Sequence, residues 1–450
     1  MHQELAGPAA RLGQGEHVLL GLVGGPSTGS RVVRRVLGGL LVLLGAASLL
    51  RATQSLGVEY VYMKDFVQDY LWVRAVLAGV DPYRDITELA LQFFGFVPLG
   101  VFPHPNAHPP TIGLLMLPLA WVDYQTASAV WLALDFAFVL VAVFLMGVAS
   151  GSRLSVRATA LVGVALMAWY PFHKELVLGQ LSTLVLLLLC GAWLSLQKDR
   201  RGLAGALLGL AIVIKPVPWP LLLVLLVRKE WRALGGAVAA MGIAGLLTLG
   251  VLGFDRLLTY QSGLRAVGEL HRAEAQNMSI TTVGWRVFHG TQSTILTAIS
   301  APPLVEFEPA ARGLSLGLPA LALALGCIAA ARHRRLDVAL AMMLCISLLI
   351  SPISWDHYLV LAAFPAAILG GRIWRREESR ASLNVAMLVA LVLLLPVRTW
   401  MDLAVQVSGT PEDGLAVSFW AGLLTYVPSV GVAALAWLVR PESTVGAISE

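Results

Sequence analysis

The chain has 450 residues, of which 57% are hydrophobic and only 13% are charged. A soluble domain usually carries about 25% charged residues, so this composition excludes an ordinary soluble protein and predicts a polytopic membrane protein. The net charge of +5 does not indicate nucleic-acid binding, because the basic residues lie in short loops between apolar runs, where they report orientation in the membrane.

The chain begins with a weakly patterned, glycine-rich segment over residues 1–30. We expect this segment to be a disordered cytoplasmic tail, and we expect a second cytoplasmic tail over 441–450. The first apolar run follows Arg31, Arg34 and Arg35 and is typical of a membrane anchor rather than a cleavable signal. All three cysteines fall inside apolar runs, so no disulfide framework is indicated.

About twelve apolar runs are counted as helices of one all-α transmembrane domain over residues 31–440. They cover roughly 32–52, 126–149, 155–171, 176–196, 202–215, 216–228, 231–253, 313–331, 336–352, 355–371, 382–398 and 415–439. Five loops between these runs are basic, and placing both termini in the cytoplasm puts all five on the cytoplasmic side. This threading requires residues 109–122, a short run interrupted by Pro118, to form a juxtamembrane or re-entrant helix on the outer side.

The remaining loops then all face outward, and they hold nearly all the polar residues of chemical interest. Two of them are long: a first outer loop over 53–125, with juxtamembrane helices, and a second over 254–312. The shorter ones include the segment with His173, the turn at Lys215 and the segment around His357. Sorting the loops by charge therefore predicts that these residues meet at one surface of the membrane.

The stretch 63–83 in the first outer loop predicts an amphipathic helix. Asp65 and Asp69 are four residues apart and share one face of it. The apolar stripe opposite comprises Phe66, Tyr70, Val73 and Leu77. Gly79 is suited to end the helix. Two interpretations stay open: a helix lying on the membrane with a solvated acidic face, and a site in which Asp65, with Asp69 as second choice, acts as a general base.

Three residues in other outer segments are candidates for binding a phosphorylated substrate. Lys215 stands where an apolar run turns back through two prolines. Two interpretations are open: its ammonium binds an anion, or it extends to the lipid headgroups. His357 lies at the start of an expected helix, whose N-terminus favours an anion; the alternative is an interfacial aromatic belt that includes Trp355. Gln180 lies inside a span, where its amide braces helices or touches substrate.

Other polar residues give weaker signals. His104 and His108 are four apart, but the intervening Pro105 disfavours the helix that would align them on a metal, so we expect no metal site. Asn277 begins a triplet that fits a glycosylation sequon. Glu175 and Lys174 are adjacent and are interpreted as a pair.

The order of several motifs resembles glycosyltransferase family 87. These motifs are Asp65-Phe-x-x-x-Tyr70, Leu77-x-Gly79-x-Asp-Pro82-Tyr83, His108-Pro-Pro110, Gly179-Gln180, Lys215-Pro216, Asn277-x-Ser279 with Arg286, and Ser351-Pro-Ile-Ser-Trp-x-His357-Tyr358. The resemblance covers about 60–365. It implies the membrane fold called GT-C and transfer of mannose, or in some members arabinofuranose, from a polyprenyl phosphate to a lipid or glycan acceptor outside the cytoplasm. The family's catalytic acid falls on Asp65, whereas Ser182 and Asp69 depart from its usual pattern and bear on the choice of sugar and acceptor.

The resemblance thus implies an inverting hexosyltransferase of the cytoplasmic membrane, monomeric and without a cofactor. Asp65 would take the proton of the acceptor hydroxyl, while Lys215, His357 and Arg286 would stabilise the leaving phosphate. Gln180 would contact the donor, and the secondary candidates are Asp69, Tyr70, His108, His173, Asn277 and Trp355. A flippase for a lipid-linked sugar, a glycan ligase and a non-catalytic scaffold are the alternatives.

Overall fold

The computed structural model describes residues 28–152, 154–294, 297–375, 380–409 and 416–439. Within these ranges the chain is helical and contains no named strand, only three isolated β-bridges. The helices are α2 Thr28–Gln54, α3 Phe66–Leu77, α4 Ile86–Phe94, α5 Thr111–Met116, η2 Leu117–Trp121, α6 Tyr124–Ala149, α7 Val156–Leu166, α8 Tyr170–Leu178, α9 Ser182–Gln197, α10 Arg201–Ile214, α11 Leu221–Val227, α12 Trp231–Leu252, α13 Phe254–Leu270, α14 Thr282–His289, α15 Glu308–Arg332, α16 Leu336–Ile350, η3 Asp356–Ala362, α17 Ala363–Trp374, α18 Arg380–Leu394, α19 Val397–Ser408, α20 Phe419–Gly422, η4 Leu423–Tyr426 and α21 Val427–Val439.

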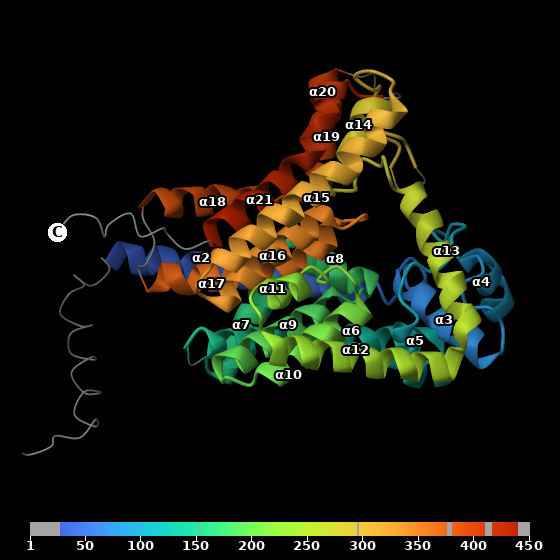
Figure 1. The fold of residues 1–450 in the computed structure, drawn as a ribbon, viewed down its shortest axis with the longest axis horizontal. Helices are drawn as coiled ribbons and strands as arrows, with labels where there is room; N and C mark the ends of the chain where they lie inside the picture. Colours follow the sequence, from blue (N-terminus) through green and yellow to red (C-terminus); the bar gives the residue numbers. More distant parts are fainter. Residues whose placement is uncertain (1–27, 153, 295–296, 376–379, 410–415, 440–450) are drawn as a thin grey trace, which may run out of the picture.

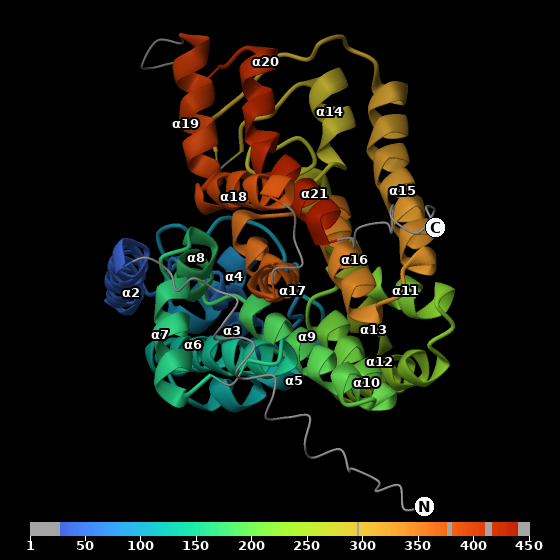
Figure 2. The same ribbon diagram turned by 90° about the vertical axis from the view of Figure 1, so that its left-hand side faces the viewer.

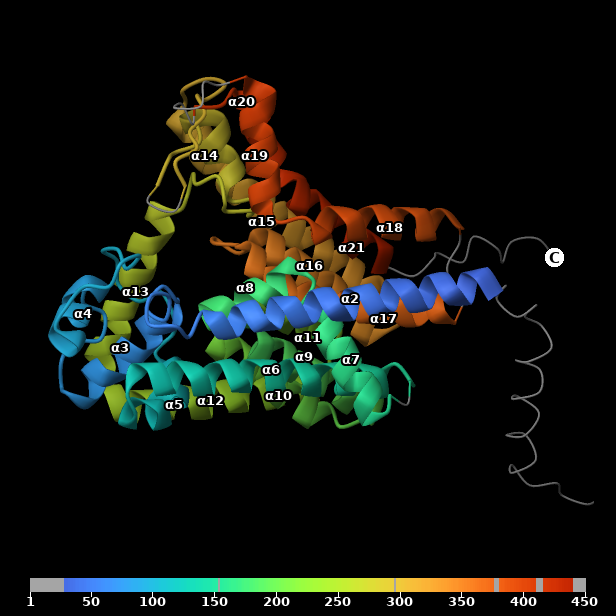
Figure 3. The same cartoon turned by 180° about the vertical axis from the view of Figure 1, so that it is seen from behind.

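The helices form two layers: α6 and α12 of the lower layer run along the long axis of the molecule, whereas α15 and α21 of the upper layer are inclined to it (Figure 1). In the lower layer α9 packs between α6 and α10, and α10 packs against α12; in the upper layer α16 contacts α15 and α21 (Figure 2). Seen from behind, α2 lies along the outside and contacts α7 and α8 (Figure 3). The start of α2 and the end of α21 lie at one end of the molecule, and α3, α4 and α13 lie at the other (Figure 1).

In the part of the chain that the structure describes, five helices are long and apolar enough to cross a membrane, or up to seven if each of two sharply bent helix pairs is one span. Four further apolar helices are shorter. The protein is therefore a multi-pass, all-helical membrane protein, while the predicted number of about twelve spans is not confirmed. For example, the run predicted as a span over 216–228 contains only the seven-residue helix α11.

The two predicted tails lie largely outside the described residues. The expected disordered tails at 1–30 and 441–450 fall there, except that residues 28–30 already belong to α2. The run at 109–122 forms the two short helices α5 and η2, and its position outside the membrane core stays a prediction.

Helix α3 lies within the stretch 63–83 that was predicted to contain a helix, but its surroundings differ from the membrane-lying interpretation. It ends at Leu77 with Ala78 as its C-cap, and Gly79 follows with a φ of +70°. Nine of its twelve residues, Asp69 among them, are buried. The helix packs against α4, α5, η2 and α6 around a satellite aromatic core. A solvated acidic face is therefore wrong, because short helices of the first outer loop cover the side of α3 that a membrane-lying helix would expose.

A break between α8 and α9 shapes the centre of the molecule. The two helices meet at 119°, and Gly179 ends α8 in the left-handed region with φ +67°. A Cβ on Gly179 would lie 2.9 Å from the Cβ of Phe66, so only glycine allows this close approach of α8 to α3. The break leaves Gln180 between two helices, instead of inside the continuous span that the sequence predicted.

Candidate active site

A cavity of about 800 Å³ lies between the first outer loop, α8, α13 and η3. Five separate segments that the sequence assigned to the outer side contribute to its lining, represented by Asp65, Lys174, Lys215, His271 and His357. These five segments are far apart in the chain and are separated by helices such as α6, α9 and α12. The structure therefore brings the polar loops together around one cavity, as the sequence predicted.

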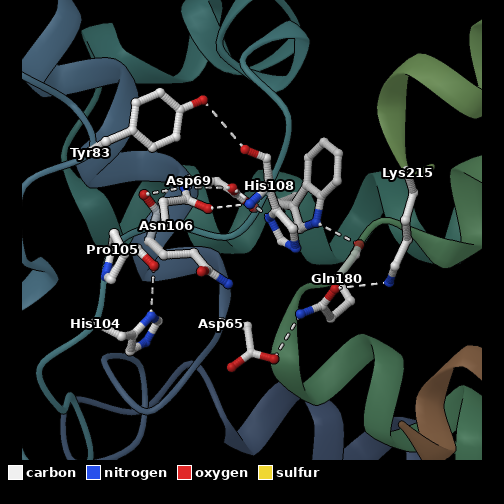
Figure 4. Close-up of polar contacts among 11 residues, drawn as sticks. Asp65, Asp69, Tyr83, His104, Pro105, Asn106, His108, Gln180 and Lys215 are labelled. Carbon is white, nitrogen blue, oxygen red and sulfur yellow. Dashed lines mark hydrogen bonds and ion pairs between the residues drawn. The ribbon is translucent and has the colours of Figure 1, made fainter. Parts of the chain in front are cut away.

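Asp65 and Lys215 are joined through the side-chain amide of Gln180 (Figure 4). The Gln180 Nε2 donates to Asp65 Oδ2 at 2.7 Å, and the Gln180 Oε1 accepts from Lys215 Nζ at 3.2 Å. All three residues line the cavity. Asp65 is partly exposed to it at the N-cap of α3, whereas Gln180 and Lys215 are buried. The arrangement holds a carboxylate and a cation at a fixed separation along one wall.

Lys215 is held inside the protein rather than extended to the headgroups. Its side chain is 3% exposed, and its Nζ donates to Ser182 Oγ at 2.9 Å and lies 3.8 Å from the centre of the Tyr358 ring. The snorkelling interpretation is therefore wrong for this residue. Glu175 does not pair with Lys174 as the sequence suggested: its carboxylate accepts from the backbone N–H groups of Ser182 and Thr183 at the start of α9.

His357 lies on the same cavity, and its imidazole is 2% exposed. Neither ring nitrogen has a hydrogen-bond partner among the described residues. The neighbouring Asp356 accepts from Lys174 Nζ at 2.7 Å, and this ion pair anchors η3 to α8. Trp355 also lines the cavity, edge-on to the His271 ring at 5.1 Å. A buried imidazole with two unused nitrogens beside a cavity is suited to contact a polar ligand.

A second carboxylate reaches the cavity through a histidine. Asp69 Oδ1 lies 2.7 Å from His108 Nδ1 and accepts from Asn106 Nδ2 at 3.2 Å (Figure 4). Asp69 itself is 1% exposed and does not line the cavity, whereas His108 does. Nearby, burial lowers the pKa of the His104 imidazole below its usual value, so His104 is neutral at pH 7.

A comparison with known families identifies the class of protein to which this chain belongs. A model of glycosyltransferase family 87 matches residues 106–352, which is more than half of the chain. The chain belongs to glycosyltransferase family 87. The match includes Lys215 and Gln180 but begins after Asp65, whose assignment therefore rests on the geometry of the cavity and on the motif order.

Three characterised glycosyltransferases are similar to this family 87 chain. The α-(1→3)-arabinofuranosyltransferase of Mycobacterium tuberculosis is 28% identical over 58% of this chain and 59% of its own length. The polyprenol-phosphate-mannose-dependent α-(1-2)-phosphatidylinositol mannoside mannosyltransferase of the same organism is 26% identical over 91% of this chain and 94% of its own. An α-(1→3)-arabinofuranosyltransferase of Corynebacterium glutamicum is 27% identical over 41% and 40%. No solved structure matches.

Besides Asp69, four of the predicted site residues of this family 87 chain do not line the cavity. Arg286 is buried, donates to the Thr425 hydroxyl at 2.6 Å and to the backbone carbonyls of Glu274 and Asn277, and stacks on Tyr426. Asn277 donates to the carbonyls of His271 and Pro352 and ties the second outer loop to the segment before η3. These contacts give both residues a structural function.

Tyr70 and His173 also lie apart from the cavity. The Tyr70 hydroxyl donates to the Val122 carbonyl at 2.8 Å, and burial raises its pKa above the usual value. His173 Nδ1 contacts the Ser48 carbonyl at 3.1 Å on the α2 side of α8. His173 is one residue before Lys174, and the turn of α8 points the two side chains in different directions.

The structure adds lining residues that sequence reasoning did not single out. Arg272 stacks over the Trp285 ring at 4.2 Å, and both line the cavity with Tyr260 of α13. His271 lies in contact with the buried Glu274 carboxylate. The sequence signal that could have identified these residues is their position in the predicted second outer loop. No group of three or more His, Cys, Asp or Glu side chains suited to a metal occurs in the described parts of the chain, and independence from a metal stays a prediction.

Proposed function

We propose that this family 87 glycosyltransferase moves a hexose, with mannose as first choice, from a polyprenyl-phosphate donor to a lipid or glycan acceptor. The reaction takes place at the outer face of the cytoplasmic membrane. Family membership supports glycosyl transfer, and the mannosyltransferase that is similar over 91% of this chain uses a polyprenol-phosphate-mannose donor according to its name. The acceptor class is proposed from the same relative.

The observation that carries the proposal is the hydrogen-bonded series Asp65–Gln180–Lys215 along one cavity wall. Inversion at the anomeric carbon requires a proton acceptor on one side of the sugar and stabilisation of the leaving group on the other. Asp65 receives the proton of the acceptor hydroxyl as the new glycosidic bond forms. Lys215 stabilises the negative charge on the departing polyprenyl phosphate as the anomeric C–O bond breaks.

His357 supplies a second contact for the phosphate in this proposal. His357 lines the same cavity as Lys215, and its two buried ring nitrogens have no hydrogen-bond partner among the described residues. A buried donor is worth most in a site that excludes water. A phosphate held by protein cations leaves without the help of a metal, so we propose catalysis with no cofactor.

The proposed architecture is GT-C-like and has both termini in the cytoplasm. It has about twelve membrane crossings if the shorter apolar helices are included in the count. The common position of the two ends of the described chain in Figure 1 supports termini on one side. We also propose a monomer that binds a lipid-linked donor, a lipid or glycan acceptor and the bilayer, with no nucleic-acid partner.

Arabinofuranose is the second candidate for the donated sugar, because two of the similar proteins are named as arabinofuranosyltransferases. A ligase for preassembled glycans would use the same outer surface, with basic residues such as Arg272 of the second outer loop. A flippase would need a polar route through the membrane, whereas the polar residues here gather around one cavity.

The test compares the purified parent with Asp65→Asn, using polyprenyl-phosphate mannose as donor and octyl α-mannoside as acceptor. We expect the variant to lose about 10²-fold or more in kcat, the usual contribution of a general base. Asp402→Asn is the matched control, because Asp402 is an exposed acid on α19 that does not line the cavity. Equal transfer rates in parent and Asp65→Asn would contradict the assignment, and parallel reactions with polyprenyl-phosphate arabinofuranose decide the sugar.

A further inference from the structure

The Asp69–His108 pair is not used by the proposed chemistry, yet its geometry is closely specified. Asp69 on α3 and His108 before α5 are 39 residues apart in the chain. The distance between Asp69 Oδ1 and His108 Nδ1 is 2.7 Å, and Asp69 is completely buried. Asn106 Nδ2 donates to the same carboxylate oxygen. A buried carboxylate is costly unless partners satisfy it, and here Oδ1 has two partners whereas Oδ2 has none among the described residues. The cost of burying this carboxylate suggests that the pair has a function.

The pair fixes the orientation and the tautomer of the imidazole. The backbone N–H of His108 donates to Asn106 Oδ1 at 2.7 Å, and the Tyr83 hydroxyl donates to the His108 carbonyl at 3.5 Å. Because the Asp69 carboxylate accepts a hydrogen bond, it keeps the proton of a neutral imidazole on Nδ1. The lone pair of Nε2 is then left as a hydrogen-bond acceptor.

The free acceptor faces the cavity. His108 lines it together with Asp65 and Gln180, and no described residue bonds to its Nε2. In Figure 4 the ring lies between Asp69 and the Asp65–Gln180 contact, and Lys215 lies beyond Gln180. A neutral acceptor nitrogen backed by a carboxylate disfavours a phosphate and suits a hydroxyl.

We propose that His108 Nε2 accepts a hydrogen bond from a second hydroxyl of the acceptor sugar, and that Asp69 is a positioning residue for His108. This inference rests on the proposed function and deepens it. In an inverting reaction the acceptor approaches opposite the leaving phosphate. His108 lies on the Asp65 side of Gln180 and Lys215 on the other, so His108 meets the acceptor rather than the phosphate (Figure 4). The contact selects acceptors that carry a hydroxyl beside the nucleophilic one.

The test uses the full-length protein, polyprenyl-phosphate mannose, octyl α-mannoside and its monodeoxy analogues. His108→Asn is the main variant, because its side-chain amide nitrogen stands near the position of Nδ1 and still donates to Asp69, while Nε2 is removed. We expect the KM for octyl α-mannoside to rise about tenfold while the KM for the donor is unchanged. We also expect one monodeoxy analogue to react about tenfold less efficiently than octyl α-mannoside with the parent, and equally well with His108→Asn.

Asp69→Asn is the second variant, and we expect a smaller rise in the same acceptor KM because the tautomer is no longer enforced. His173→Asn is the matched control, since His173 bonds a backbone carbonyl away from the cavity. Retention by His108→Asn of the parent's discrimination between the acceptor and every deoxy analogue would overturn the inference, as would a change confined to the donor KM. Absence of transfer by the parent itself would instead overturn the proposed function, and the inference with it.

Discussion

Asp65 and Lys215 bind the two ends of one side-chain amide, that of Gln180, with 2.7 Å on the carboxylate side and 3.2 Å on the ammonium side. The chemistry of the amide allows only one orientation, because its NH₂ group donates to the carboxylate and its oxygen accepts from the ammonium. The proposed base and the proposed phosphate-binding cation are therefore placed relative to each other by a neutral group. This spacer prevents the two charges from collapsing into a direct ion pair.

The first prediction concerns Gln180 itself. Gln180→Leu removes both hydrogen bonds and leaves the charge on Asp65 and Lys215 unchanged, so we expect kcat to fall about tenfold to a hundredfold, since each bond to a charged group contributes about 1.5–3 kcal/mol. Gln125→Leu is the control, because Gln125 is exposed on α6 outside the cavity. Steady-state kinetics measure both variants. An equal loss of activity in Gln180→Leu and Gln125→Leu would contradict the proposed spacer function.

The second prediction concerns the leaving group. Lys215→Met keeps most of the side-chain volume and its contact with the Tyr358 ring but removes the charge, so we expect a 10²-fold to 10³-fold loss in kcat, as for one donor of an anion hole. The matched control is Lys198→Met, an exposed lysine at the end of α9 remote from the cavity. Donors with phosphate leaving groups of graded acidity provide the check: the defect should shrink as the leaving group becomes more acidic. A defect that is constant across the series would argue against a function for Lys215 at the phosphate.

The sequence predicted this surface better than it predicted the individual contacts. Loop charges assign a side to whole segments, which is why Asp65, Lys215 and His357 were correctly expected to meet. The presence of helix α3 and its end close to Gly79 also followed from local rules, since apolar spacing and Gly79 act within the segment. Both kinds of signal are carried by neighbouring residues.

What could not be predicted depends on contacts between distant segments. The carboxylate of Asp69 looked solvated because nothing in residues 63–83 indicates that His108 covers it. Arg286 and Asn277 were selected as polar residues of an outer loop, but their partners are backbone carbonyls that only the folded chain brings near. The helix break at Gly179 likewise depends on the approach of Phe66 from another helix.

The third prediction tests that break. Gly179→Ala places a Cβ at φ +67° and 2.9 Å from the Phe66 Cβ, so we expect a loss of about 1–3 kcal/mol in the free energy of unfolding, together with reduced activity because Gln180 is displaced. Gly250→Ala is the control: this glycine lies in α12 with open space around its Cα, where alanine favours the helix. Thermal unfolding in detergent should show a lower midpoint for Gly179→Ala only. Equal midpoints for the two variants would show that the break tolerates a side chain.

The fourth prediction concerns Lys64, which donates to Ser55 Oγ at 2.6 Å and to the Val177 carbonyl at 2.9 Å. Burial lowers the pKa of Lys64 from 10.5 to about 8, and the Asp135 carboxylate partly opposes this shift. Between these two values the unfolded chain binds more protons than the folded one, so this residue makes the free energy of unfolding rise with pH across the window. We expect Lys64→Met to remove up to about 3 kcal/mol of that rise.

The measurement for Lys64 is the difference in unfolding free energy between parent and variant at pH 7, 8, 9 and 10.5. Other groups that titrate in this range cancel in the difference, and Lys198→Met serves as control because Lys198 is exposed. The parent should gain relative to Lys64→Met as the pH rises above about 8. A difference that does not change with pH would mean that Lys64 is as well solvated as a surface lysine.

The fifth prediction concerns the side of the membrane on which the cavity opens. Glu59, just before α3, and Lys198, at the far end of α9, are both exposed and lie on opposite sides in the proposed threading. In intact cells a membrane-impermeant maleimide should label Glu59→Cys, whereas Lys198→Cys should react only after the membrane is opened. Two of the native cysteines, Cys190 and Cys345, are buried, and the parent corrects for any reaction at Cys327. Labelling of both positions from the same side would contradict the threading. The threading assigns the basic loops to the cytoplasmic side and the polar cavity to the outer side, and such a result would place both on one side.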